Sequence, residues 1–320
     1  MNATAVSNRP RLYWVDVMKV LGMFFIVYGH LFTYGYQYSY AFNVPVFFIL
    51  SGFLFKEDLQ ASVFWRKLWW QLVVPMLAIC VLNNTYLIVN DLLHHRLDTS
   101  RLLFPLGMLV GQHRFLEVCW FIYTLVLLKI ISFFVRRNGF RILLAIVFLV
   151  VAFFLAQVVQ THDWTNAVLC VLPAYPFFVM GHMVKAGGFA VKPLPGWVCF
   201  AGMLLSMTAL FFIVRANGEV FLYRFIFGKD LALCMLGGMA GTALLFFVSK
   251  LLDFPVGWIR TLAVGSVVIL GFHRYLIVFY RHFIDKNPFD ILVALAILLI
   301  FVPIIRFCIK HIPWLVGNRK

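Results

Sequence analysis

The sequence predicts an all-α, polytopic integral membrane protein, and this prediction rests on its composition and its hydropathy pattern. Of the 320 residues, 63% are hydrophobic and only 12% are charged, with a mean hydropathy of +0.95. An ordinary soluble chain is about half apolar and about a quarter charged. The apolar residues recur along the whole chain in runs close to the ~20 residues that cross a bilayer as a helix. The lipid bilayer is therefore the expected environment of the chain.

Polar breaks divide the chain into about ten expected membrane spans, which form one transmembrane domain over residues 1–320. The spans cover residues 14–34, 42–56, 69–89, 116–134, 141–159, 166–184, 197–215, 230–249, 260–280 and 289–308. The second span is short, and Pro45 near its start indicates a break or an oblique entry. The apolar segment between Leu102 and Val118 holds prolines, glycines and basic residues, so it is a candidate for a re-entrant segment.

The basic residues predict the orientation of these spans. With a cytoplasmic N-terminus, sixteen Lys and Arg residues fall in the cytoplasmic connections and eight in the others. This imbalance favours two cytoplasmic termini. It also accounts for the net charge of +15, so no nucleic-acid partner is expected. The six cysteines are scattered without a CxxC pair, so no metal site is expected either.

The first span carries three ionisable side chains, Asp16, Lys19 and His30. Such groups inside a span usually face a bundle interior or a polar cavity. Lys19 and His30 are eleven residues apart, which is close to three helical turns, so both lie on one face about 16 Å apart. Asp16 is placed to pair with Lys19, and a neutral His30 is suited to take a proton from a hydroxyl. The alternative is an interfacial Asp16 and Lys19 anchor, with His30 as a hydrogen-bonded interhelical residue.

Two motifs add a family resemblance to this pattern. A basic residue, ten intervening residues and a histidine, here Lys19 and His30, are followed by PVFFILSGFLF at residues 45–55. This arrangement resembles the membrane acyltransferase-3 family, which includes short stand-alone O-acetyltransferases of bacterial surface polysaccharides. Weaker similarities are RKLWWQLVVP at 66–75, CWFIYTL at 119–125, PFFVMGHMVK at 176–185 and GFHRYLIVF at 271–279. Lys19 replaces an arginine of many members, which favours a point charge over a bidentate contact.

The resemblance implies an acyl-CoA-dependent enzyme in a bacterial cytoplasmic (inner) membrane. It would move an acyl group, most simply from acetyl-CoA or else from another acyl-CoA, to a hydroxyl of an exopolysaccharide, a lipid-linked glycan or another envelope glycan. Polysaccharide synthesis machinery is a possible further partner. His30 would act as the general base or as a transiently acylated nucleophile, together with Lys19 and Asp16. Arg66 and Lys67 would meet the CoA phosphates at the cytoplasmic rim.

Further candidates follow from side chains placed in or beside the spans. On the donor side, Ser51, Trp120 or Tyr123 would supply a hydrogen bond to the developing oxyanion. Helix packing at Ser51 and an interfacial aromatic belt are the alternatives. On the acceptor side, the candidates are Glu117, His273, Arg274 and Tyr34, the last of which opens the aromatic run YGYQYSYAF. For Glu117 the alternative is an exposed loop acid, and for Tyr34 the same interfacial belt.

A polar cavity inside about ten helices also suits a transporter or flippase for an anionic substrate. A third possibility is a non-catalytic subunit of a polysaccharide synthesis or export machine. Only an enzyme requires His30 for acyl transfer.

Overall fold

The computed structural model describes residues 12–57, 59–95, 99–158, 166–188, 190 and 192–317. Within these ranges the chain is all-α, and only two isolated β-bridges occur, Gln112 with Asn166 and Phe221 with Ile226. The predicted fold class is therefore confirmed. Both chain ends, residues 1–11 and 318–320, lie outside the described residues.

The main helices follow the predicted spans closely. They are α1 (Tyr13–His30), α2 (Tyr36–Tyr40), α3 (Pro45–Phe53), α4 (Ala61–Leu68), α5 (Val74–Leu93), α6 (Phe104–Leu109), α7 (His113–Leu116), α8 (Trp120–Phe134), α9 (Asn138–Val158), α10 (Val171–Ala186), α11 (Gly196–Asn217), α12 (Leu231–Leu251), α13 (Gly257–Val264), α14 (Ser266–Phe283) and α15 (Asp290–His311). A π-helical turn at Trp69–Val73 joins α4 to α5. The short helices α6 and α7 occupy the segment that was a candidate for re-entry.

Six helical stretches among the described residues are long and apolar enough to cross a membrane. They are Ala61–Leu93, His113–Phe134, Asn138–Val158, Gly196–Asn217, Leu231–Leu251 and Asp290–His311. The pair α13 and α14 would make a seventh span, broken by an 84° bend at Gly265. The other three predicted spans fall on α1, α3 and α10, which are shorter or carry more charge. The protein is thus a polytopic membrane protein, while ten spans and two cytoplasmic termini stay predictions.

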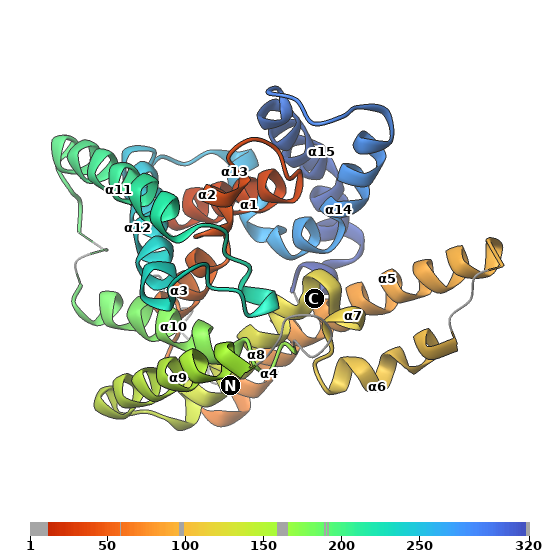
Figure 1. Cartoon of the computed structure of the whole chain (residues 1–320), viewed down its shortest axis with the longest axis horizontal. Helices are drawn as coiled ribbons and strands as arrows, with labels where there is room; N and C mark the ends of the chain where they lie inside the picture. The colour runs from red at the N-terminus through yellow and green to blue at the C-terminus, as the bar shows by residue number, and fades with distance from the viewer. Residues whose placement is uncertain are drawn as a thin grey trace, which may run out of the picture.

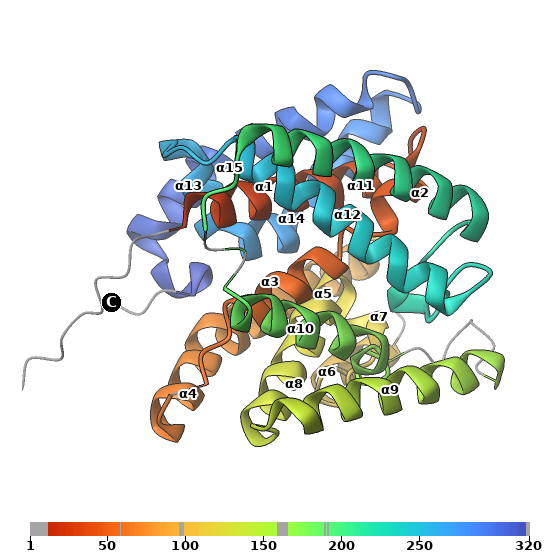
Figure 2. The same cartoon turned by 90° about the vertical axis from the view of Figure 1, so that its left-hand side faces the viewer.

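The helices form two groups that meet at α1 and α3 (Figures 1 and 2). On one side α3, α8, α9 and α10 lie together, and on the other α12, α13, α14 and α15 surround α1, with α11 packed against α12. Eleven of the eighteen residues of α1 are buried, including Asp16. Because α1 is enclosed by other helices, its polar side chains face protein and cavities instead of lipid, as expected for charged groups at membrane depth.

Two glycines allow α3 and α10 to pack with their backbones in contact. A methyl group on Gly52 would overlap the carbonyl oxygen of Phe178, and one on Gly181 would overlap the carbonyl oxygen of Ile49. Small residues of this kind are the usual means by which membrane helices approach closely. The SG step in the second predicted span therefore has a packing role through Gly52.

A buried arginine ties α9 and α10 to the loop after α3. Arg141 is 1% exposed, and its guanidinium binds Glu57, the Ser132 carbonyl oxygen at 3.0 Å and His182 Nε2 at 2.7 Å. Partial burial by itself raises the pKa of Glu57, but the hydrogen bond and charge of Arg141 lower that pKa below its ordinary value. Glu57 is thus a carboxylate at neutral pH, and Arg141 has a structural role as the buried partner of this carboxylate.

Candidate active site

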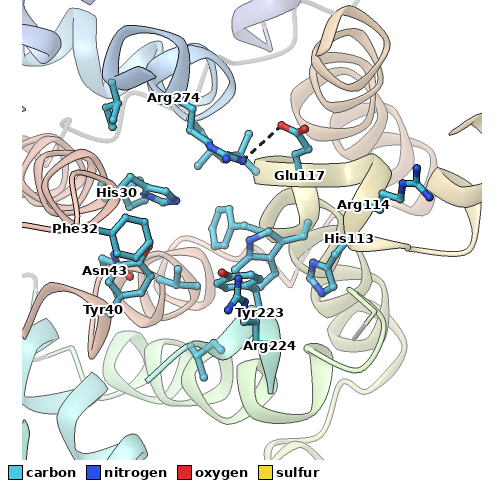
Figure 3. Close-up of a pocket in the computed structure, with 18 of the residues that line it drawn as sticks. His30, Phe32, Tyr40, Asn43, His113, Arg114, Glu117, Tyr223, Arg224 and Arg274 are labelled. Atoms are coloured by element: carbon cyan, nitrogen blue, oxygen red, sulfur yellow. Dashed lines mark hydrogen bonds and ion pairs between the residues drawn. The ribbon is translucent and has the colours of Figure 1, made fainter. Parts of the chain in front are cut away.

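A large cavity, of about 620 Å³, opens where α1 ends. It lies between α1, the segment from α7 to α8, α14 and the loop that joins α11 to α12 (Figure 3). Its polar and aromatic lining includes His30, Phe32, Tyr40, Asn43, Arg101, His113, Arg114, Glu117, Trp120, Tyr223, Arg224 and Arg274. These residues come from five separate parts of the sequence. A mostly pre-formed cavity with converging polar groups is the usual form of a small-molecule site.

His30 is the last residue of α1 and faces this cavity. Its Nδ1 lies 2.8 Å from the carbonyl oxygen of Ile26, one turn earlier in the same helix. A carbonyl oxygen only accepts hydrogen bonds, so Nδ1 carries the proton in the neutral imidazole. The lone pair is then on Nε2, which is the atom that a general base or nucleophile needs. The helix backbone thus selects the tautomer of His30.

His273 packs directly behind His30. The two imidazole rings meet edge to face with centroids 4.9 Å apart, and His273 is fully buried. Its Nδ1 lies 2.9 Å from the carbonyl oxygen of Ile269, while its Nε2 has no hydrogen-bond partner in the described parts of the chain. Since His273 does not line the cavity, its contact with the site is through the ring of His30. His273 therefore restricts where that ring can move.

Glu117 and Arg274 face each other across the cavity edge, with a carboxylate oxygen 3.7 Å from Nη1 (Figure 3). Glu117 has a backbone φ of 45°, in the left-handed region that residues other than glycine seldom adopt. This conformation turns the chain between α7 and α8 and points the carboxylate inward. Strained residues of this kind cluster at functional sites.

An aromatic wall completes the cavity. The rings of Trp120 and Tyr223 lie 6.2 Å apart between centroids, and His113 lies 5.7 Å from Trp120. On the opposite side Tyr40 lies 6.0 Å from the His30 ring and contacts Phe32. Flat rings at the edge of a polar cavity are suited to pack against the faces of a sugar or another ring-shaped ligand.

The other predicted residues of α1 lie at its opposite end. Asp16 is 6% exposed and Lys19 is half-buried, so both are inside the protein as their charge pattern predicts. Lys19 is close enough to Lys129 of α8 for the two charges to interact. His30 ends α1 and Trp120 begins α8, and both line the large cavity. Since Lys19 and Lys129 approach each other at the other end, α1 and α8 are antiparallel.

A second cavity, of about 260 Å³, lies at that opposite end. Lys56, Lys67, Gln71 and Lys129 supply its polar lining. Arg66, the neighbour of Lys67 in α4, is exposed and does not line this cavity. Three ammonium groups around one small cavity form a suitable surface for phosphate groups. Of the two predicted CoA-binding cations, only Lys67 is thus in the wall of a cavity.

Three further predicted residues lie outside the lining of these two cavities. Ser51 is half-buried in α3 beside the close contact of Gly52. The Tyr123 hydroxyl donates to the carbonyl oxygen of Leu109 at 2.9 Å, so its proton is already engaged. The Tyr34 side chain is 72% exposed. Of the three oxyanion candidates, Trp120 alone lines the large cavity.

Several cavity residues were not among the sequence candidates, namely Phe32, Tyr40, Asn43, Arg101, His113, Arg114, Tyr223 and Arg224. Tyr40 belongs to the aromatic run that begins at Tyr34, so the run was informative although its first member is not in the cavity wall. The hydroxyl of Tyr36 in the same run binds Glu219, and this hydrogen bond, with burial, raises the pKa of Tyr36 to about 12. No local signal connected Arg224 with His30, since 194 positions separate them.

Metal ions in proteins are usually bound by clusters of His, Cys, Asp and Glu side chains. Among the residues that the structure describes, no three His, Cys, Asp or Glu side chains lie close enough to bind one. The polar atoms at the large cavity instead suit hydrogen bonding and charge contacts to an organic ligand.

The match to protein families agrees with this geometry. A family model described as an acyltransferase domain matches residues 12–309, which is almost the whole chain and includes His30, the cavity lining and the basic cavity. The chain belongs to the acyltransferase 3 family. Membership in the acyltransferase 3 family makes it a membrane acyltransferase that takes an acyl group from a donor. Searches against curated proteins and solved structures returned no match.

Proposed function

We propose that this acyltransferase 3 protein is an acyl-CoA-dependent O-acyltransferase that modifies a hydroxyl of an exopolysaccharide or another envelope glycan. Acetyl-CoA is the simplest donor. The observation that carries the proposal is the position of His30 at the wall of the 620 Å³ cavity, with Nδ1 2.8 Å from the Ile26 carbonyl oxygen, a contact that favours the tautomer with a free lone pair on Nε2. A bacterial inner membrane, with CoA on the cytoplasmic side and glycan on the other, is the setting in which this arrangement is useful.

The chemistry follows from the free lone pair of His30. Nε2 takes the proton of the acceptor hydroxyl while the oxygen attacks the thioester carbonyl carbon. The C–S bond then breaks, and the CoA thiolate recovers the proton from the imidazolium, so the products are an ester and free CoA. In the alternative route Nε2 itself attacks the thioester and expels the CoA thiolate. The acceptor hydroxyl then attacks the acyl group on the imidazolium, which restores the neutral imidazole, and the hydroxyl proton passes to the thiolate. The indole N–H of Trp120 is the proposed donor to the oxyanion.

The donor would enter from the basic cavity. Lys67 and Lys129 would meet the CoA phosphates there, while the narrow pantetheine arm runs along α1 and α8 toward His30. By helix geometry Lys19 and His30 lie about 16 Å apart, and Lys129 and Trp120 about 14 Å apart. The phosphates thus stay at one end of the site while the thioester reaches the other. Asp16 would moderate the positive charge beside Lys19.

A direct test separates an enzyme from the alternative transporter. Purified protein is placed in vesicles with glycan inside and acetyl-CoA, labelled separately in its acetyl and its CoA parts, outside. For an enzyme we expect acetyl label to accumulate on the enclosed glycan as alkali-labile ester, with an equal amount of free CoA outside. Movement of unmodified glycan or of intact acetyl-CoA, without new ester, would contradict the proposal and favour a transporter.

The Lys67→Ala variant tests the donor site. Loss of one ammonium group from the small basic cavity should raise KM for acetyl-CoA about 5- to 30-fold, corresponding to about 1–2 kcal/mol for a partly exposed charge contact to phosphate. The value of kcat should change little, because Lys67 is remote from His30. Arg66→Ala is the matched control, since Arg66 is the adjacent cation of the same helix but is not in the cavity wall. Equal effects of both variants would argue against binding in this cavity.

A further inference from the structure

The charges around the large cavity are strongly unequal. Its lining contains four arginines, Arg101, Arg114, Arg224 and Arg274, and one carboxylate, Glu117. With neutral histidines the lining therefore carries a net charge of +3, four positive minus one negative. Asp91 compensates Arg101 through a 2.8 Å contact from outside the lining. Guanidinium groups that share a partly enclosed cavity repel each other unless a ligand brings negative charge.

Among these four arginines, Arg224 has the guanidinium that is best preorganised to bind an anion. Its guanidinium lies over the ring of Tyr223 at 5.2 Å and over that of Phe221 at 5.9 Å. Neither a hydrogen bond nor an ion pair joins this guanidinium to any other part of the chain that the structure describes. These rings hold the guanidinium in place while its N–H groups stay available, and the N–H edge of an arginine can bind a carboxylate or phosphate with two hydrogen bonds.

The loop that carries Arg224 is held in place by buried groups. Asn217, which is 2% exposed, donates to the Phe227 carbonyl oxygen at 2.8 Å and accepts from the Asp230 backbone N–H at 2.8 Å. Phe221 and Ile226 exchange two backbone hydrogen bonds and so close a tight hairpin around Arg224. A loop fixed at both ends in this way presents its side chains without a large loss of conformational entropy on binding.

Arg274 approaches the same space from the other edge of the cavity (Figure 3). Its side chain is 53% exposed, and its contact with Glu117 is a long one at 3.7 Å. The guanidinium therefore retains N–H groups for a second partner. His30 lies on one side of the cavity, with Arg274 and Arg224 entering from opposite edges. An anion bound between them would place a neighbouring hydroxyl near His30.

One polar atom in the lining suits the neutral part of such a ligand. The side-chain oxygen of Asn43 is buried and lacks a hydrogen-bond partner within the described ranges. Buried polar atoms are normally paired, so this oxygen is placed to accept from a ligand hydroxyl. The rings of Trp120 and Tyr223, also in the lining, provide flat apolar surface. A hydroxyl partner, aromatic faces and arginines together match an acidic sugar.

We infer that the acceptor is an acidic saccharide whose carboxylate or phosphate group binds between Arg224 and Arg274. This inference rests on the proposed function, because it assigns the acceptor of that same site. A neutral sugar would leave Arg224 without a counter-charge and Arg274 with only its long contact to Glu117, whereas one anionic group reduces the repulsion and fixes the orientation of the ring. The anion thereby determines which hydroxyl reaches His30.

The test measures binding without acyl-CoA, so that its failure can be distinguished from failure of the acyl-transfer proposal. The probes are a galacturonic acid hexamer and its methyl ester, which share a backbone and differ in charge, bound to purified protein in nanodiscs. We expect the acid to bind at least about 10-fold more tightly than the ester, with a preference that falls at high salt. Arg224→Gln should remove this preference, and Arg224→Lys should retain part of it.

Arg215→Gln is the matched control, because Arg215 also packs over an aromatic ring, that of Phe211 at 5.9 Å, but lies outside the cavity. Equal binding of acid and ester, no binding of either at millimolar concentration, or an unchanged preference in Arg224→Gln would overturn the inference. Arg274→Gln provides a second test if Arg224→Gln fails to fold. A charge preference found only between succinyl-CoA and acetyl-CoA would place the anion on the acyl group and would also overturn it.

Discussion

His30→Ala should lower kcat for acyl transfer about 10³-fold, with protein abundance in the membrane unchanged. Positioned general bases contribute about 10²- to 10⁴-fold to a rate. His30 is at the end of α1, and among the described residues its imidazole is hydrogen-bonded to the Ile26 carbonyl oxygen within the same helix. Truncation therefore removes the base and its ring contact with His273 but breaks no hydrogen bond between helices. The measurement is release of free CoA by purified protein with acetyl-CoA and acceptor glycan.

His282→Ala is the control for this experiment, because His282 is an exposed residue of α14 outside the cavity lining. It should retain near wild-type turnover. If His30→Ala retained more than about a tenth of the wild-type kcat, neither of the two proposed routes through Nε2 could operate. The enzyme would then require another base, and His113 would be the next residue to replace, since it also lines the cavity.

Gly52→Ala should prevent assembly of the folded protein. The added methyl group would overlap the carbonyl oxygen of Phe178, which belongs to the α10 backbone and cannot rotate away as a side chain would. Overpacking of a closely packed contact costs about 1–3 kcal/mol when side chains can adjust, so a clash with backbone should cost at least about 3 kcal/mol. We expect low membrane abundance and, for any protein recovered, a lowered melting temperature in detergent.

Gly181→Ala should act in the same way, because its methyl group would overlap the Ile49 carbonyl oxygen from the other side of the α3–α10 contact. Gly139→Ala is the control. Gly139 is also helical, but no atom lies within 4 Å of the position of an added methyl group. Alanine there should be neutral or slightly stabilising, by up to about 1 kcal/mol. Normal stability of Gly52→Ala would mean that α3 and α10 do not meet in the described way.

Hydropathy and residue spacing along the sequence were sufficient to predict properties that depend on a single helix. Hydropathy predicted a polytopic α-helical membrane protein, because every span must satisfy its own backbone hydrogen bonds in lipid. The spacing of Lys19 and His30 predicted one buried helical face, and their motif indicated the family that the match over residues 12–309 shows. The helices support six or seven spans by length and composition, so the predicted count of ten stays a prediction.

The same sequence patterns predicted less well which residues line a cavity that several helices form together. Tyr34 and Tyr123 had the residue types of site members, yet one side chain is exposed and the hydroxyl of the other binds a backbone carbonyl. Composition could not distinguish them from Tyr40 and Tyr223, which do line the cavity. Similarly, Arg66 and Lys67 are adjacent cations, and the rotation of α4 alone determines which of them faces the basic cavity.

The sequence by itself determined the membrane environment, the helical class and the position of the proposed base, since each follows from short-range hydrophobicity and spacing. The tertiary structure decided which residues surround that base. It brings His273 behind His30, bends the ninth predicted span at Gly265 and places Arg224 opposite Arg274. These contacts join residues far apart in the chain, and they depend on how whole helices pack against each other, which no local pattern of residues encodes.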